Sequence, residues 1–367
     1  MSLKSRTGMY TLLYRYSPKP EKVKAIGGKV FYISRFTPTL TAMIPDQKYL
    51  SVLKKDPDLM YISRDQTFSL PFYHVKKIFS PSIMMKANQM HLSKQVIPWN
   101  IQRVWGKHYL NSGQGIRVGV IDTGIDLNHP NLAKNVKGGI NIIHPSKSPQ
   151  DDNGHGTHIA GTIGALKNRV GVVGIAPKVS LYAIKVLDSS GMGSLSNLIK
   201  GIEWGIANHM HILNISISGG KNIPPVLQKI VKEAVSRGII IVAAAGNHGS
   251  TSGQGDTVEI PARLSEVISV AAVNKSNERA SFSATGKMVD IAAPGVDILS
   301  TYHQKRYAVL NGTSMATAHV SGVMAIYRAL YPRKSVADLK RIVFRKAIDL
   351  PPKGKDSLTG YGLIQVS

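Results

Sequence analysis

Apolar and polar positions follow two different patterns along the chain. Over the first seventy residues, short stretches rich in Tyr, Val, Ile and Phe predict strands, at 9–16, 30–36, 39–44 and 59–64. Between them, one segment opens with proline and another carries Leu50 and Leu53 on one face, which predicts helices at 20–26 and 47–55. Residues 1–70 are therefore expected to form a small α+β domain.

From residue 95 onward, apolar runs alternate with amphipathic stretches. The clearest strands are expected at 116–121, 180–186, 212–217, 239–244 and 267–272. Helices are expected at 155–166, 194–209, 224–237 and 313–330. This alternation is typical of a mostly parallel sheet with helices on both faces. We therefore predict an α/β domain at 95–367, preceded by a linker at 71–94 that contains two prolines.

Three short segments, each flanked by glycine, carry the side chains of nucleophilic acyl transfer. Asp122 lies in VGVIDTG, His155 in NGHGTH and Ser314 in NGTSMA. The order Asp, His, Ser is the one found in subtilisins. A fourth segment, AAAGN, ends at Asn247. Each segment alone could be an ordinary turn or helix cap, but the four together predict one catalytic set.

Two other chemistries are considered for the same residues. Asp122-Thr123-Gly124 is also the triplet of aspartic proteases, but that reaction needs a second carboxylate and the chain has no second triplet. His155 and His158 could form half of a metal site, yet the chain lacks cysteine and offers no convincing third ligand nearby. We therefore expect His158 to be a packed residue of the helix.

From Gln95 to about Val366 the chain resembles the subtilisin family of serine endopeptidases. Residues 1–70 more loosely resemble the inhibitory propeptide of that family, a ferredoxin-like domain. The resemblance implies peptide and protein substrates, and the chain's own propeptide as an intramolecular inhibitor. At position 318 the family usually has proline; Ala318 stands there and should leave the helix intact.

The resemblance also implies the role of each catalytic residue. Asp122 would orient His155, and His155 would take the proton of Ser314 as that hydroxyl attacks the peptide carbonyl. Asn247 and the Ser314 N–H would bind the resulting oxyanion. No cofactor is expected for this reaction.

Two segments resemble the edges between which a substrate pairs as an added strand. They consist of Gly191, Met192, Gly193, Ser216, Ile217, Ser218 and Gly219. Glu259 falls where subtilisins commonly have glycine at the bottom of the first specificity pocket. A carboxylate there would select Lys or Arg before the scissile bond, because a buried charge needs a partner. Alternatively, Glu259 points to solvent.

The segment from Gln95 to Trp99 resembles the start of mature subtilisins, and Lys94 precedes it. Cleavage after Lys94 would suit an acidic pocket, whereas Leu92 or Met90 would suit an apolar one. The chain is therefore expected to be a zymogen that processes itself near Lys94.

A loop resembles the strong calcium site of the family. Its predicted ligands are Gln95, Asn131, Leu166, Asn168, Val170 and Val172. None carries a carboxylate, and Lys167 and Arg169 flank the loop, so structural calcium should bind weakly or not at all.

Composition changes this picture little. The formal net charge is +25, but positive residues are spread along the chain, so nucleic acid is not an expected partner. The absence of cysteine excludes disulfides. No apolar run is long enough for a signal peptide or a membrane span.

We expect a secreted monomer whose signal peptide is not in this chain. The alternative is a catalytically silent, propeptide-inhibited scaffold that binds anionic surfaces.

Overall fold

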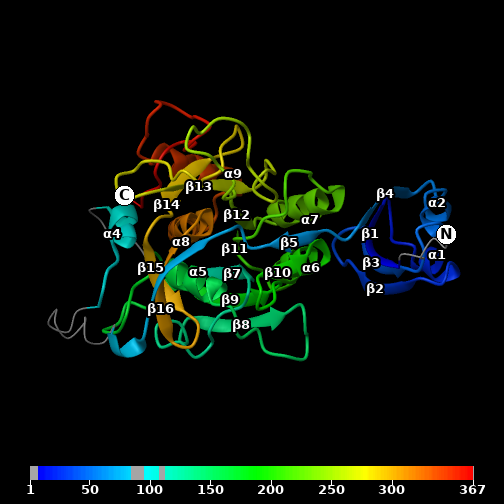
Figure 1. The fold of residues 1–367 in the computed structure, drawn as a ribbon, viewed down its shortest axis with the longest axis horizontal. Helices are drawn as coiled ribbons and strands as arrows, with labels where there is room; N and C mark the ends of the chain where they lie inside the picture. Colours follow the sequence, from blue (N-terminus) through cyan, green and yellow to red (C-terminus); the bar gives the residue numbers. More distant parts are fainter. Residues whose placement is uncertain (1–6, 84–94, 107–111, 367) are drawn as a thin grey trace.

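A computed structural model of the chain describes residues 7–83, 95–106 and 112–366. Figure 1 shows a small unit at the N-terminus beside a larger one. The chain leaves the small unit through β4 (Leu59–Arg64) and β5 (Thr67–Ser69) and then crosses the larger unit. None of the helices in these ranges combines the length and apolar character that a membrane crossing needs.

The small unit is a four-stranded antiparallel sheet with two helices. Its elements before β4 are β1 (Gly8–Tyr14), α1 (Pro20–Ala25), β2 (Lys29–Ile33), β3 (Thr39–Ile44) and α2 (Tyr49–Leu53). The strand order β2-β3-β1-β4 is that of a ferredoxin-like fold. Leu12, Val23 and Leu40 are among the side chains that form its separate apolar core. The predicted strands and helices are found, within a few residues at their ends.

The larger unit is built on a seven-stranded sheet whose neighbouring strands are all parallel. Its order is β14-β13-β12-β11-β7-β9-β8. The strands are β7 (Arg117–Asp122), β8 (Val136–Asn141), β9 (Ser180–Lys185), β11 (Ile212–Ile215), β12 (Ile240–Ala244), β13 (Ile268–Val273) and β14 (Ile291–Pro294). The predicted α/β class is therefore confirmed.

Helices bury both faces of this sheet. The helices of the larger unit are α4 (Trp99–Trp105), α5 (His155–Gly164), α6 (Leu195–Ala207), α7 (Pro225–Ser236), α8 (Thr313–Leu330) and α9 (Val336–Arg345). Successive strand residues face opposite sides: Val120 joins the core of α5 and α8, and Ile121 joins that of α6 and α7. Helix α8 runs unbroken through Ala318, as expected for alanine in place of proline.

Around the start of the predicted linker, at residues 67–79, the chain forms two strands that the sequence pattern does not indicate. β5 pairs with β10 (Met192–Ser194), and β6 (His74–Phe79) pairs with β16 (Arg306–Asn311), which also pairs with β15 (Ile298–Tyr302). Most side chains of β6 are exposed, so it lacks the alternation of a half-buried strand. Its pairing depends on a partner more than two hundred residues away.

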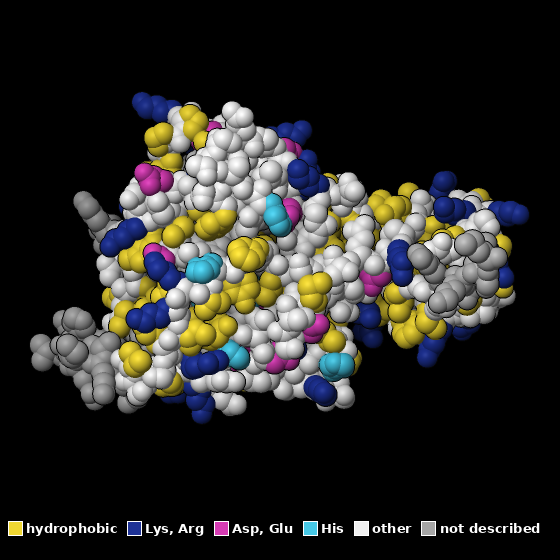
Figure 2. Space-filling model, viewed as in Figure 1, with side chains coloured by type: hydrophobic (Ala, Val, Ile, Leu, Met, Phe, Trp, Pro, Cys, Tyr) yellow, Lys and Arg dark blue, Asp and Glu magenta, His cyan; other side chains and the backbone are white. Residues whose placement is uncertain are grey.

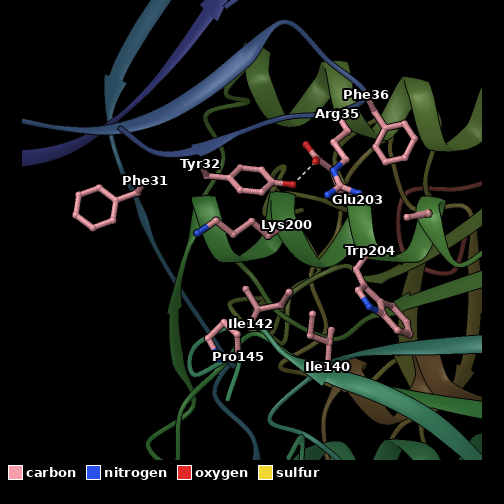
Figure 3. A pocket seen from close by; sticks show the side chains of 11 residues that line it. Phe31, Tyr32, Arg35, Phe36, Ile140, Ile142, Pro145, Lys200, Glu203 and Trp204 are labelled. Atoms are coloured by element: carbon pink, nitrogen blue, oxygen red, sulfur yellow. Dashed lines mark hydrogen bonds between the residues drawn. The ribbon is translucent and has the colours of Figure 1, made fainter. Parts of the chain in front are cut away.

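The two units meet at α6 and α7, and the guanidinium of Arg237, directly after α7, lies 5.0 Å from the centre of the Phe36 ring. The hydroxyl of Tyr32 donates a hydrogen bond to Glu203, and the ammonium of Lys200 lies 5.1 Å from the centre of the Tyr32 ring. Figure 3 shows these side chains lining a cavity of about 430 Å³ between the units. Nearby, Asp65 accepts hydrogen bonds from the N–H (2.9 Å) and hydroxyl (2.6 Å) of Ser196 at the start of α6.

Two buried histidines should make the larger unit less stable against unfolding in acid. Burial lowers the pKa of His158 to about 3 and that of His319 to about 4. Between pH about 6.5, the usual histidine pKa, and these values, the unfolded chain binds protons that the folded protein does not. The free energy of unfolding should therefore fall as the pH is lowered, by about 1.4 kcal/mol per pH unit for each histidine.

Denaturant unfolding measured between pH 7 and 4 checks this expectation. Replacing His319→Gln should reduce the slope of unfolding free energy against pH. Replacing the exposed His209→Asn is the matched control and should leave the slope unchanged. An equal slope in the wild type and in His319→Gln would show that His319 is not the source.

Candidate active site

The four predicted catalytic residues lie where strands end and helices begin. Asp122 is the last residue of β7, His155 the first of α5, and Ser314 the second of α8. Asn247 follows the end of β12 by three residues. Open parallel sheets collect functional groups at this edge. The side chains of Asp122, His155 and Ser314 are fully buried, and Asn247 is nearly so.

His155 and Asp122 form a direct pair. The Nδ1 atom of His155 lies 2.8 Å and 3.0 Å from the two carboxylate oxygens of Asp122, and the N–H of Thr123 also donates to Oδ1. This pairing places a hydrogen on Nδ1, so in the neutral imidazole Nε2 is the acceptor. Nε2 is buried and has no hydrogen-bond partner among the described residues. An unpaired basic nitrogen inside the site can accept a proton.

Ser314 and Asn247 are held beside each other at the start of α8. The hydroxyl of Ser314 donates weakly to the carbonyl of Ser216, at 3.4 Å. The side-chain oxygen of Asn247 accepts from the N–H (3.0 Å) and hydroxyl (2.7 Å) of Thr313. This fixes the amide so that its NH₂ group donates to the carbonyl of Phe72, at 2.6 Å. A peptide carbonyl from the chain itself is therefore bound by the predicted oxyanion donor Asn247.

Residues before Phe72 pair with both predicted substrate edges. Ser69 exchanges two backbone hydrogen bonds with Ser218 (3.1 and 3.0 Å), and the N–H of Leu70 donates to the carbonyl of Gly191 (3.0 Å). Met192 and Gly193 pair with Ser69 and Phe68. A Cβ atom at Gly219 would lie 2.4 Å from the buried ring of Phe68. Ile217 is buried and belongs to the core of α6 and α7.

The pairing changes at Pro71. Proline has no N–H, so the strand cannot continue its ladder at this residue. The side chain of Phe72 is 77% exposed and therefore does not fill a pocket. Next to it, the ring of Tyr73 lies 4.9 Å from that of His155, and its hydroxyl donates to Asn153 (3.3 Å). The segment therefore covers His155 while leaving the first specificity pocket without a side chain from Phe72.

Glu259 is buried rather than pointing to solvent. It is 8% exposed, and Oε1 accepts a hydrogen bond from Nδ1 of His248 at 2.8 Å. Oε2 is buried and has no hydrogen-bond partner in the part of the chain that the structure describes. The carboxylate lies beside the backbone of Gly246, where a Cβ atom would approach Oε2 to 3.1 Å. Sequence reasoning did not identify His248, although it directly follows Asn247.

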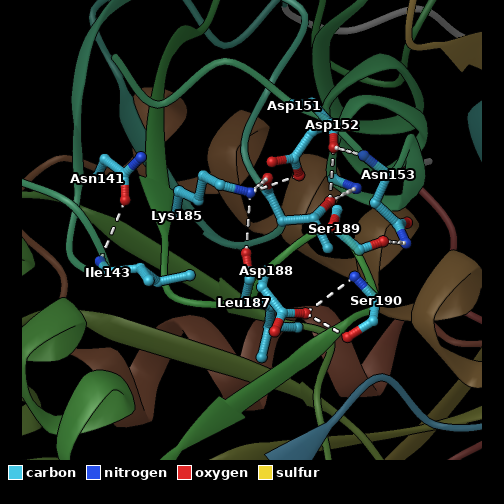
Figure 4. Close-up of polar contacts among 12 residues, drawn as sticks. Asn141, Ile143, Asp151, Asp152, Asn153, Lys185, Leu187, Asp188, Ser189 and Ser190 are labelled. Carbon is cyan, nitrogen blue, oxygen red and sulfur yellow. Dashed lines mark hydrogen bonds and ion pairs between the residues drawn. The ribbon is translucent and has the colours of Figure 1, made fainter. Parts of the chain in front are cut away.

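Two further residues that sequence reasoning missed support the loops around Asp122. The buried carboxylate of Asp151 accepts from the hydroxyl of Thr123 (2.9 Å) and from N–H groups at the start of α5. The ammonium of Lys185 donates to the carbonyl of Leu187 (3.0 Å) and to Asp152 (2.7 Å) (Figure 4). It also donates to the carbonyl of Thr123 (2.7 Å). A lysine at the end of an apolar strand could have signalled such a role.

The oxygens of the predicted calcium loop lie together as expected, but an amide nitrogen lies among them. The side-chain nitrogen of Gln95 lies within 2.7 to 3.1 Å of oxygens from Leu166, Asn168, Val170 and Val172. The NH₂ group of Asn131 also donates to the carbonyl of Val170, at 2.7 Å. These oxygens face amide donors, and no carboxylate is among them. In this arrangement the residues do not fit a calcium ion, which needs oxygen ligands.

His158 lies outside the site, as predicted for a packed residue. It is fully buried on α5, and Nε2 contacts the carbonyls of Ile298 (2.9 Å) and Ala308 (3.2 Å). Within the described ranges, no three His, Asp or Glu side chains are grouped so that they could hold a metal ion. Lys94, Leu92 and Met90 fall outside the described residues.

Comparison with known proteins agrees with this geometry. A model described as the subtilase family matches residues 113–362. Subtilisin E of Bacillus subtilis (strain 168) is 40% identical over 352 residues, which cover 95% of this chain and 84% of that protein. Subtilisin Savinase of Lederbergia lenta is 44% identical over 273 residues, which cover 74% of this chain and 97% of that protein. The chain belongs to the subtilase family and is a subtilisin-like serine endopeptidase.

Proposed function

We propose that Asp122, His155, Ser314 and Asn247 carry out the reaction. Nε2 of His155 takes the hydroxyl proton as Oγ of Ser314 attacks the peptide carbonyl, while Asp122 stabilises the imidazolium. Asn247 binds the oxyanion, His155 returns the proton to the leaving amine, and water then hydrolyses the acyl-enzyme. The observation that carries this proposal is the hydrogen bond from Asn247 to a peptide carbonyl, beside the buried pair of His155 and Asp122.

The N-terminal residues act as an inhibitory propeptide in this proposal. Three features support it: the contact of Tyr32 with Glu203, the contact of Asp65 with the start of α6, and the strand pairing of Ser69 in the cleft. A covered cleft excludes other peptides. The protein would therefore be a zymogen until this segment is cut and leaves.

Glu259 supports a preference for Lys or Arg before the scissile bond. Its Oε2 is buried with no partner within the described ranges, and a cationic side chain would give it one. Phe72 stays outside the pocket, and its apolar ring could not pair with a carboxylate. The bond after Phe72 is therefore presented to Asn247 with the wrong side chain. A cut near Lys94, as the sequence predicts, would match the pocket better.

The alternative function is a silent scaffold on anionic surfaces. In Figure 2, Lys and Arg side chains are scattered singly or in small groups over the visible face rather than joined in one patch. Scattered charge gives no defined surface for a polyanion on this face, so this face does not favour that alternative. Secretion and a monomeric state remain predictions from the sequence.

Intact mass of the full chain over time tests the proposed function. The wild type should be cut after Lys94, and Ser314→Ala should stay whole, because only Ser314 supplies the nucleophile. Cleavage in both proteins would point to a contaminating protease. A wild type that stays folded and uncut would contradict the zymogen proposal.

The same measurement on Phe72 variants tests the pocket. Phe72→Lys should be cut quickly after residue 72, because its ammonium can reach Glu259, whereas the matched Phe72→Leu should not. Adding Glu259→Gln to Phe72→Lys should slow that cut by at least about tenfold, as expected for loss of a buried charge partner. If Phe72→Leu is cut as quickly as Phe72→Lys, the preference for basic residues is wrong.

Calcium should not stabilise the protein. The Tm should be equal in millimolar calcium and in chelator, because amide N–H groups already satisfy the loop oxygens. Asn131→Asp removes one donor and adds a carboxylate, so its Tm should become calcium-dependent. A calcium-dependent Tm in the wild type would show that Gln95 turns its oxygen toward a bound ion.

A further inference from the structure

Beyond the cleft, the chain covers the edge of a second small sheet. β6 pairs antiparallel with β16 through five residue pairs, from His74 opposite Asn311 to Phe79 opposite Tyr307. The other edge of β16 is paired with β15. β16 ends three residues before Ser314, so this sheet edge leads directly to the proposed nucleophile. If β6 left, the N–H and C=O groups on this edge would lose their partners.

The same stretch of chain occupies both sides of the cleft. Before Phe72 it lies between Gly191 and Ser218, and after Phe72 it follows β16. The carbonyl of Phe72 on Asn247 marks the point between them. Relative to a scissile bond at that carbonyl, β16 lies on the side that takes residues after the bond.

The pairing of β6 depends little on its own side chains. All of them are exposed except that of Phe79, which is half-buried. Backbone hydrogen bonds therefore supply most of the contact, and such bonds accept many different sequences. Another extended peptide could take the same place.

One contact in this region involves a side chain of β6 and would favour a cationic residue at that position. Lys76, the fourth residue after Phe72, places its ammonium 2.9 Å and 3.0 Å from the two carboxylate oxygens of Asp297. The backbone of Asp297 is itself fixed: its N–H donates to the side chain of Asn311 (2.6 Å), and its carbonyl accepts from the indole of Trp99 (3.1 Å). These hydrogen bonds fix the backbone of Asp297, so its carboxylate is held beside the fourth residue after Phe72.

From this geometry we infer that the edge of β16, together with Asp297, is a binding site for substrate residues that follow the scissile bond. The site takes an extended peptide of about six residues and prefers Lys or Arg at the fourth position. The inference rests on the proposed function, because release of the N-terminal residues uncovers this edge. Unpaired edges readily accept an added strand.

Three quenched-fluorescent peptides test the inference with the self-processed protein. All three contain residues 67–71 of the chain followed by a lysine, and the scissile bond comes directly after that lysine. Two of the peptides continue for seven residues after the bond and have either Lys or Glu as the fourth of these residues. The third ends at the second residue after the bond. In the wild type, kcat/KM for the Lys peptide should exceed that for the Glu peptide about two- to fivefold, as for an exposed ion pair. The short peptide should be cut at least about tenfold less efficiently than the Lys peptide.

Variants at Asp297 provide the matched comparison. The Lys-to-Glu ratio should fall to about one in Asp297→Asn and should invert in Asp297→Lys, and each ratio is internal to one protein preparation. Equal kcat/KM for the Lys and Glu peptides in the wild type, or for the short and long peptides, would overturn the inference while leaving the proposed function intact. If the wild type cuts none of the peptides faster than Ser314→Ala does, the proposed function is wrong and the inference is wrong with it.

Discussion

The buried hydrogen bond between His155 and Asp122 is the contact that the rest of the site depends on. It forms because β7 ends and α5 begins at the same edge of the parallel sheet. Burying a carboxylate costs free energy unless donors surround it, and here the donors are His155 and the N–H of Thr123. Two further contacts fix the same loop: the hydroxyl of Thr123 donates to Asp151, and the carbonyl of Thr123 accepts from Lys185. The orientation of His155 is thus set by the fold and not by the substrate.

The cleft is the second organising feature, because the chain itself fills it. Strand pairing at Ser69 and Leu70, a carbonyl on Asn247 and a ring against His155 place the segment as a substrate would lie. Pro71 interrupts the backbone pairing, and Phe72 does not enter the pocket beside Glu259. In the proposed function, correct backbone contacts with a mismatched side chain would let the segment stay bound while its own cleavage is disfavoured.

Sequence patterns identified what is encoded locally. The glycine-flanked motifs located Asp122, His155 and Ser314, and the apolar runs located most strands of the sheet. They did not predict β6, since its pairing depends on β16, far away in the chain. The partner of Glu259, His248, also went unnoticed. In the predicted calcium loop, the hydrogen bonds that turn the amide nitrogen of Gln95 toward the loop oxygens depend on the folded backbone, so the sequence could not show them.

The most direct test of the central claim is covalent labelling by a fluorophosphonate, followed by mass spectrometry of the peptides. In the self-processed protein, the account predicts one adduct, on Ser314, formed through the base His155. In His155→Ala, labelling should drop by at least about a hundredfold, as expected for loss of a general base. Labelling at another serine, or an equal rate in His155→Ala, would contradict the assignment of these residues.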